Sequence, residues 1–240
     1  MEAEQIPLAP ETRFSFTCSP EVPCFTRCCR ELVQALTPYD ALRLAAGLGL
    51  SAREFRERYT RLHPGPETGL PILTLAPVSG ACPFVTAQGC RVYADRPSSC
   101  RAYPLLRAAG LPGQGPPASE AWFLLREPHC RGFDGPPRWT AAAWAEAQGL
   151  EAYNRENDRM LPLLRAKRRL HPAPLAGGLA ARVAAALYDP EALREEFAAG
   201  RIPGGERILE RHPGATAGEG LALLHAGLEA AEALLREASR

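Results

Sequence analysis

Two neighbouring segments between residues 37 and 60 place apolar residues at helical spacing behind a clear start signal. Residues 37–40 (Thr-Pro-Tyr-Asp) combine a capping threonine, a proline at the first helical position and an acidic third residue. We expect this helix to end near Gly47 or Gly49. Residues 51–54 (Ser-Ala-Arg-Glu) form a capping box, which predicts a second helix that ends near Thr60.

Longer helices are predicted in the second half of the chain. Thr140 is a capping residue for a helix that runs toward Leu164, and residues 189–191 (Asp-Pro-Glu) start another that Gly200 ends. Residues 216–219 start the last helix. We expect its apolar stripe to pack on the body of the protein, and contact with a protein partner or a second copy in a homodimer is the alternative. The stripe consists of Leu221, Leu224, Leu228, Ala231 and Leu235.

Strand signals are short and confined to the middle of the chain. Residues 70–75 and 91–93 are the two candidates, and they predict no more than a small ribbon. Residues 111–117 contain three prolines and two glycines and are expected to be an exposed loop.

The composition does not favour binding to nucleic acid or insertion into a membrane. The 28 basic and 27 acidic residues leave a formal charge of +1, so no nucleic-acid partner is expected. No segment reaches the roughly 18 uninterrupted apolar residues that a membrane span needs. Residues 1–13 lack the apolar stretch of a signal peptide. We therefore expect a cytoplasmic protein, whose thiols stay reduced.

The strongest chemical signal is the set of eight cysteines. Thiolates ligate zinc and the iron of sulfide clusters, because soft negative sulfur outcompetes water for these ions. In a reducing compartment such clusters hold metal more often than disulfides. Two four-coordinate sites, or one four-cysteine cluster and a second mixed site, would use all eight. The predicted ligands are Cys18, Cys24, Cys28, Cys29, Cys82, Cys90, Cys100 and Cys130.

The spacing of the cysteines favours an iron–sulfur cluster over zinc as the cofactor. Zinc sites usually present C-x2-C pairs, and the chain contains none. The wide intervals between Cys82, Cys90 and Cys100 suit a larger cluster that is reached from several loops. Zinc is the alternative cofactor, and metal ions are the predicted partners.

Local geometry limits which thiols can face one ion. The apolar spacing after Pro23 predicts a helix from about Cys24 to Leu36, on which Cys24 and Cys28 share a face. Cys29 is rotated by about 100° from Cys28, so it serves a second centre, bridges, or packs. The cysteines of the middle cluster are separated by prolines and a glycine and must converge through loop folding. We expect the two clusters to meet in space and to share the ligation.

Arginines crowd the middle cluster at positions 91, 96, 101 and 107. Guanidinium groups could offset the negative charge of a thiolate assembly, donate hydrogen bonds to sulfur or receive an anionic ligand. A solvated basic loop is the alternative interpretation. Arg96 and Arg101 flank Cys100, and they are the predicted cofactor-binding residues together with Tyr103.

The segments around the cysteines resemble the CxxCxxCC family, the zinc- or iron-chelating cysteine-cluster proteins of the YkgJ type. The similarity runs from Phe16 to about Asn157 and implies metal chelation. The first cysteines are spaced C-x5-C-x3-C-C, which is wider than the C-x2-C-x2-C-C of the family name. The resemblance is carried by residues 24–29, 36–40, 82–104 and 129–133, followed by Trp144, Gln148, Tyr153 and Asn157.

These observations predict a fold that is mainly α, with a small β ribbon, irregular metal-binding loops and minor α+β content. Residues 1–138 are expected to form a cysteine-cluster metal-binding domain, and residues 139–240 a helical C-terminal region packed on it. The leading function is chelation of an iron–sulfur centre or zinc by the clustered cysteines, in a redox or metal-handling role.

Two other functions are kept as alternatives. The first is a cluster-dependent protein-modifying enzyme, because the resemblance extends to flagellin lysine methylases, which share the cysteine cluster. The second is a structural zinc protein whose helical tail binds a partner. The chain contains no Ser-His-Asp order, HExxH pair or phosphate-binding loop, so hydrolase and kinase functions are excluded. Whether the protein is an enzyme is left open.

Overall fold

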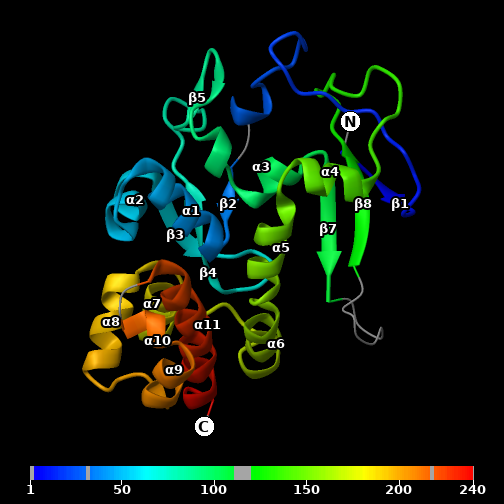
Figure 1. Ribbon diagram of the computed structural model, residues 1–240. Coiled ribbons are helices and arrows are strands. Elements are labelled where there is room, and N and C mark those ends of the chain that lie inside the picture. Colours follow the sequence, from blue (N-terminus) through cyan, green and yellow to red (C-terminus); the bar gives the residue numbers. More distant parts are fainter. Residues whose placement is uncertain (1–2, 31–32, 111–119, 217–218, 240) are drawn as a thin grey trace. The chain divides into compact units, whose positions relative to one another are not determined.

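The computed structural model describes residues 3–30, 33–110, 120–216 and 219–239 (Figure 1). Its chain divides into two compact units, each built from two separate stretches of sequence. Unit 1 comprises residues 1–33 and 77–158, and unit 2 comprises residues 34–76 and 159–240. The expected division into residues 1–138 and 139–240 stays a prediction, because compactness alone assigns no role to either stretch.

Unit 1 is built on a three-stranded antiparallel sheet in the order β1-β8-β7 (Figure 1). Leu124 of the central strand lies opposite Ile6 on one side and Leu105 on the other. Aromatic side chains complete the core, with the rings of Phe16 and Trp144 meeting edge to face at 5.5 Å. The strands are β1 (Glu4–Leu8), β7 (Leu105–Ala109) and β8 (Glu120–Arg126).

The remaining elements of unit 1 are short, and most of them carry or flank cysteines. A two-stranded ribbon pairs Val85 with Cys90, and two 3-10 turns and three helices accompany it. These elements are η1 (Cys28–Arg30), β5 (Val85–Thr86), β6 (Gly89–Cys90), η2 (Tyr93–Asp95), α3 (Ser98–Ala102), α4 (Ala141–Ala147) and α5 (Leu150–Asp158).

Unit 2 combines a second small antiparallel sheet, in the order β2-β4-β3, with helices that pack around α11. The core face of α11 is buried, and Gly227 on that face lets the helix lie directly on the backbone of α7. The elements are β2 (Ala35–Leu36), α1 (Pro38–Leu48), α2 (Ala52–Tyr59), β3 (Thr60–Pro64), β4 (Pro71–Leu75), α6 (Leu161–Leu170), α7 (Gly177–Tyr188), α8 (Pro190–Ala198), α9 (Gly205–Arg211), α10 (Pro213–Thr216) and α11 (Gly220–Glu237).

The predicted helix starts at Thr37, Ser51 and Thr140 are confirmed by their capping hydrogen bonds. The backbone N–H of Asp40 donates to the Thr37 hydroxyl at 3.1 Å, and the N–H of Thr37 donates to the Asp40 carboxylate at 3.0 Å. Ser51 and Glu54 repeat this reciprocal pair at the start of α2. Thr140 caps α4 through the backbone N–H of Ala143. These caps satisfy donors that the first helical turn leaves open.

The helix predicted from Cys24 to Leu36 is wrong over the described residues. Thr26 adopts φ 63°, in the left-handed region, and the chain forms only the single turn η1 before it continues. Leu36 then enters β2, where it lies opposite Leu73 of β4. Leu36 is therefore buried by a sheet while Val33 is exposed, and Cys24 and Cys28 do not share a helical face.

Three other boundaries also differ from the prediction. Residues 91–93 are not a strand, because the ribbon lies at β5 and β6 and a 3-10 turn follows it. The helix from Thr140 is interrupted at Gly149, whose φ of 62° turns the chain between α4 and α5, and again before α6. The last helix begins at Gly220, while Thr216 belongs to α10. The loop at 111–117 lies outside the described residues.

The prediction of a helix-rich chain with little strand is confirmed, although the sequence missed the β1-β8-β7 sheet and helices α7 and α9. The stripe on α11 is mostly core, since Leu224, Leu228, Ala231 and Leu235 are buried and only Leu221 is exposed. Among the described helices, none combines the length and the apolar character that crossing a bilayer requires.

Candidate metal centre

All eight cysteines lie in unit 1, although more than 100 residues separate the first from the last. Every one of them is a free thiol. Cys18 is exposed as a residue, and the other seven are half-buried. The fold therefore gathers the whole predicted ligand set into one compact part of the molecule.

Backbone hydrogen bonds tie the N-terminal cysteines to the later ones. The N–H of Cys82 donates to the carbonyl of Cys29 at 2.7 Å, which joins the first cluster to the second. The N–H of Arg131 donates to the sulfur of Cys24 at 3.0 Å, which brings the segment of Cys130 to the first cluster. The expectation that the two clusters meet in space is supported by these contacts.

One group of thiols forms around Cys18. Burial raises the pKa of Cys18 to about 11, and the neighbouring Cys28, Cys24 and Cys130 raise it further because thiolates repel one another. The pKa of Cys130 is also raised, first by burial, and Cys24 adds to the increase. We call Cys18, Cys24 and Cys130 the outer group.

A second group forms between η1 and the ribbon. Burial raises the pKa of Cys82, and the charges of Cys90 and Cys28 act in the same direction. The pKa of Cys29 is raised by its hydrogen bond to Cys28, by burial and by the charges of Cys28, Cys100 and Cys82. We call Cys29, Cys82, Cys90 and Cys100 the inner group.

Cys28 lies between the two groups. Its pKa is lowered, because the thiol of Cys29 donates a hydrogen bond that stabilises the Cys28 thiolate. Its charge acts on Cys18 of the outer group and on Cys29 and Cys82 of the inner group. Cys28 is thus the thiol that either group could use.

The donor set fits a thiophilic cation, but the thiols are not arranged as a finished coordination sphere. In the described part of the chain, no three side chains of the types His, Cys, Asp and Glu are placed so that they could hold one metal ion. Neighbouring thiolates nevertheless raise the pKa of one another, and a bound cation would relieve this repulsion.

Arg96 and Tyr103 interact electrostatically with the thiols, and their role in cofactor binding stays a prediction. The charge of Arg96 counteracts the effect of burial at Cys18 and at Cys90. Burial raises the pKa of Tyr103, and so does the neighbouring Cys130. The hydroxyl of Tyr103 is buried beside that thiol without a hydrogen bond of ordinary geometry.

Arg101 is held at several points. It donates to the backbone oxygen of Gln148 at 2.7 Å and to that of Ala94 at 2.5 Å. Its guanidinium lies 4.6 Å from the centre of the Tyr153 ring. Gln148 also accepts a hydrogen bond from Arg96 through its side-chain oxygen. Gln148 and Tyr153 were part of the family resemblance, but nothing in the sequence assigns them to the arginines.

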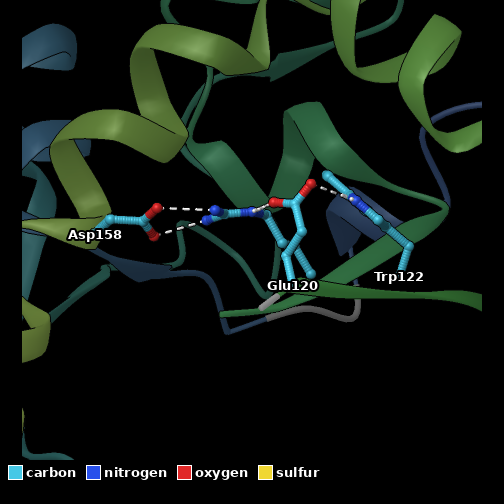
Figure 2. Close-up of polar contacts among 4 residues, drawn as sticks. Glu120, Trp122 and Asp158 are labelled. Carbon is cyan, nitrogen blue, oxygen red and sulfur yellow. Dashed lines mark hydrogen bonds and ion pairs between the residues drawn. The ribbon is translucent and has the colours of Figure 1, made fainter. Parts of the chain in front are cut away.

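Arg107 is neutralised by two carboxylates. Its guanidinium contacts Asp158 at 2.7 and 2.8 Å and Glu120 at 2.7 Å. Figure 2 labels both carboxylates and marks these contacts with dashed lines. The second Glu120 oxygen accepts from the indole of Trp122 at 3.2 Å. These partners raise the pKa of Arg107, the hydrogen bonds to Asp158 most of all. The charge of Arg107 is therefore matched by partners other than the thiols.

Glu127 is a carboxylate near the thiols that the sequence did not single out. Its charge opposes ionisation of Cys28 and of Tyr103. It also lies 3.8 Å from the ring of His129. Only its position three residues before Cys130 could have indicated this location, and that signal is weak without the fold.

A comparison with protein families gives a match that covers every cysteine. Residues 17–131 match the family CxxCxxCC, described as "Putative zinc- or iron-chelating domain". No curated protein and no solved structure matches the chain. Residues 17–131 are therefore similar to the CxxCxxCC zinc- or iron-chelating domain.

Proposed function

We propose that unit 1 chelates metal on its eight cysteines, with an iron–sulfur centre as the favoured cofactor and zinc as the second candidate. The observation that carries this proposal is the gathering of all eight free thiols in one unit. Thiol-only donors suit both cofactors, and the absence of any C-x2-C pair favours iron–sulfur ligation. A redox or metal-handling role in the cytoplasm follows from this chemistry, because free thiols persist in reducing compartments.

The grouping of the thiols supports two centres. The outer group supplies three sulfurs and the inner group supplies four, and Cys28 completes the outer set or bridges the two. Cys29 then serves the inner group although it neighbours Cys28 in sequence, because adjacent side chains rarely face one ion. When bound, an iron–sulfur cluster supplies reversible one-electron transfer, and the protein contributes the thiolates and the positive charge of Arg96 near them.

The test is purification without oxygen, followed by metal and acid-labile sulfide analysis and an absorption spectrum. We expect brown protein whose visible absorption bleaches on reduction. A colourless preparation with stoichiometric zinc and no labile sulfide would reject the iron–sulfur assignment in favour of zinc. Protein that retains neither metal after gentle purification and reconstitution would contradict chelation itself.

Cysteine variants test the two groups. Cys18→Ser should lose the metal of the outer group and keep that of the inner group, and Cys90→Ser should do the reverse. Cys28→Ser should reduce both. Ser19→Ala, beside Cys18, is the control and should retain the full metal content. If Cys18→Ser and Cys90→Ser each remove all of the metal, the thiols form one centre and the two-centre proposal is wrong.

A further inference from the structure

Arg96 and Arg101 converge on a single residue. Arg96 donates to the side-chain oxygen of Gln148, and Arg101 donates to its backbone oxygen at 2.7 Å. The Arg96 guanidinium lies 4.0 Å from the centre of the Tyr93 ring, and that of Arg101 lies 4.6 Å from the centre of the Tyr153 ring. Stacking on aromatic rings fixes the planes of both groups. Two positive charges are thereby held close together in a fixed arrangement.

No carboxylate among the described residues pairs with either charge. The hydrogen bonds of Arg101 end on Gln148, Ala94 and the hydroxyl of Tyr153, all of which are uncharged. Within the described stretches of the chain, neither Arg96 nor Arg101 takes part in an ion pair, in contrast to Arg107 with its two carboxylates. Like charges that are held together without a counter-ion destabilise the fold, so the arrangement favours an anion between or beside them.

Each of the two guanidiniums also has one N–H donor that is not used in a hydrogen bond within the described residues. Within the described residues, the Nε of Arg96 and the Nε of Arg101 are buried and have no hydrogen-bond partner. A buried donor on a charged group is costly to leave unpaired. In Arg107, by contrast, the corresponding Nε donates a hydrogen bond to Glu120 at 2.7 Å. The unpaired donors therefore point to a partner from outside the chain.

We propose that Arg96 and Arg101 bind an oxyanion group, a carboxylate or a phosphate, of a small ligand beside the cysteine cluster. Guanidinium groups recognise both chemistries through paired N–H donors. Arg96 acts on Cys18 and Cys90, so the ligand would be anchored next to the thiols. The site deepens the proposed metal function by placing a substrate or co-ligand there, but anion binding itself does not require the metal.

Isothermal titration calorimetry of the full-length protein tests the site, with inorganic phosphate and succinate as separate probes at matched ionic strength. We expect one of the two to bind, and that result identifies the oxyanion as phosphate or carboxylate. Arg101→Gln and Arg96→Gln should each weaken binding at least about tenfold, the effect of losing a charged hydrogen-bonding pair. Arg91→Gln is the control, because its guanidinium stacks on Phe84 at 5.2 Å in the same way, and it should bind within about twofold of the wild type.

Thermal unfolding and metal content separate the alternatives. The bound anion should raise the melting temperature of the wild type and leave that of Arg101→Gln unchanged, since a ligand stabilises only the protein that binds it. Arg101→Lys keeps the charge without the planar fork, and it should bind weakly even if Arg101→Gln folds poorly. Absence of binding to the wild type, or unchanged binding by both glutamine variants, would overturn the proposal. Loss of metal from Arg96→Gln and Arg101→Gln, without any anion binding by the wild type, would instead show that the arginines serve only as counter-charges to the thiolates.

Discussion

Gly227 should be among the least replaceable residues of unit 2, although alanine is normally the better helix former. It lies on the buried face of α11, where that helix crosses α7. A methyl group at this position would lie 2.1 Å from the carbonyl oxygen of Ala186 and 3.2 Å from a methyl of Leu193. Because the nearer atom belongs to the backbone, no change of side-chain rotamer relieves the contact.

The size of the effect follows from two opposing contributions. In an ordinary helix interior, Gly→Ala stabilises by about 1 kcal/mol. Forcing extra carbon into a packed core destabilises by about 1–3 kcal/mol, and sometimes by more. A contact of 2.1 Å with a backbone atom must move the helices apart, so the upper end of that range applies. We expect Gly227→Ala to lower the free energy of unfolding by about 2 kcal/mol, or the melting temperature by roughly 4–8 °C.

Urea unfolding followed by circular dichroism measures this change. Gly178→Ala in α7 is the matched control, because its methyl group would meet no atom within 4 Å, and the variant should be as stable as the wild type or slightly more so. Leu193→Ala added to Gly227→Ala should not restore stability, since the Ala186 oxygen remains in place. A Gly227→Ala protein that is more stable than the wild type would refute the close approach of the two helices.

Two further predictions concern one contact in each unit. Gly132→Ala places a methyl group 2.5 Å from the carbonyl oxygen of Thr17. The variant should therefore push the segment of Cys18 away from Cys130 and reduce the metal content of the outer group. Unchanged metal content would contradict this prediction. Asp189→Asn keeps the cap of α8 but removes the ion pair with Arg56, which is 2.8 Å long and nearly buried on the aspartate side. Urea unfolding should show a free energy of unfolding that is lower by about 1–2 kcal/mol. An unchanged free energy of unfolding would assign the role of Asp189 to capping alone.

The features that could be predicted from the sequence are those decided within four residues. The caps at Thr37 and Ser51 depend on a side chain and a backbone N–H three positions apart, and both are present. The strand conformation of Leu36 depends instead on a distant residue, Leu73, which lies opposite it in the sheet. Strand β1 was missed for the same reason, because its partner β8 is more than 100 residues away. The proline at position 7 also disfavours a strand in the sequence pattern, but β1 is an edge strand of its sheet, where proline is tolerated.

The same limit applies to the candidate site. Residue type alone identified the cysteines, since thiol chemistry does not depend on the fold. Their grouping could not be read from the sequence, because Cys18 meets Cys130 and Cys29 meets Cys82 only through contacts between distant segments. The role of Gln148 as the common partner of two arginines was hidden for the same reason: α4 must end at residue 148 before its carbonyl and side chain can receive them.

The position of the thiols on the aromatic core leads to a last prediction, about metal removal. Phe16 lies two residues before Cys18, and its ring packs on Tyr103 at 5.5 Å and on Phe133 at 5.3 Å, close to Cys130. The core of the β1-β8-β7 sheet therefore already brings distant thiols together. Its packing offsets most of the conformational entropy that is lost when those loops close. In small zinc domains the metal supplies that free energy, and removing it unfolds the chain.

Chelation of the metal from the full-length protein should therefore loosen only the parts that the core does not hold. In hydrogen exchange, residues 24–30 and the β5–β6 ribbon should lose protection, because the first form only short turns and the second pairs along only two residues. Strands β7 and β8 should keep their protection, since they pair along five residues and bury Leu105 and Leu124. Loss of protection throughout the sheet on chelation would show that the metal, and not the aromatic core, organises unit 1.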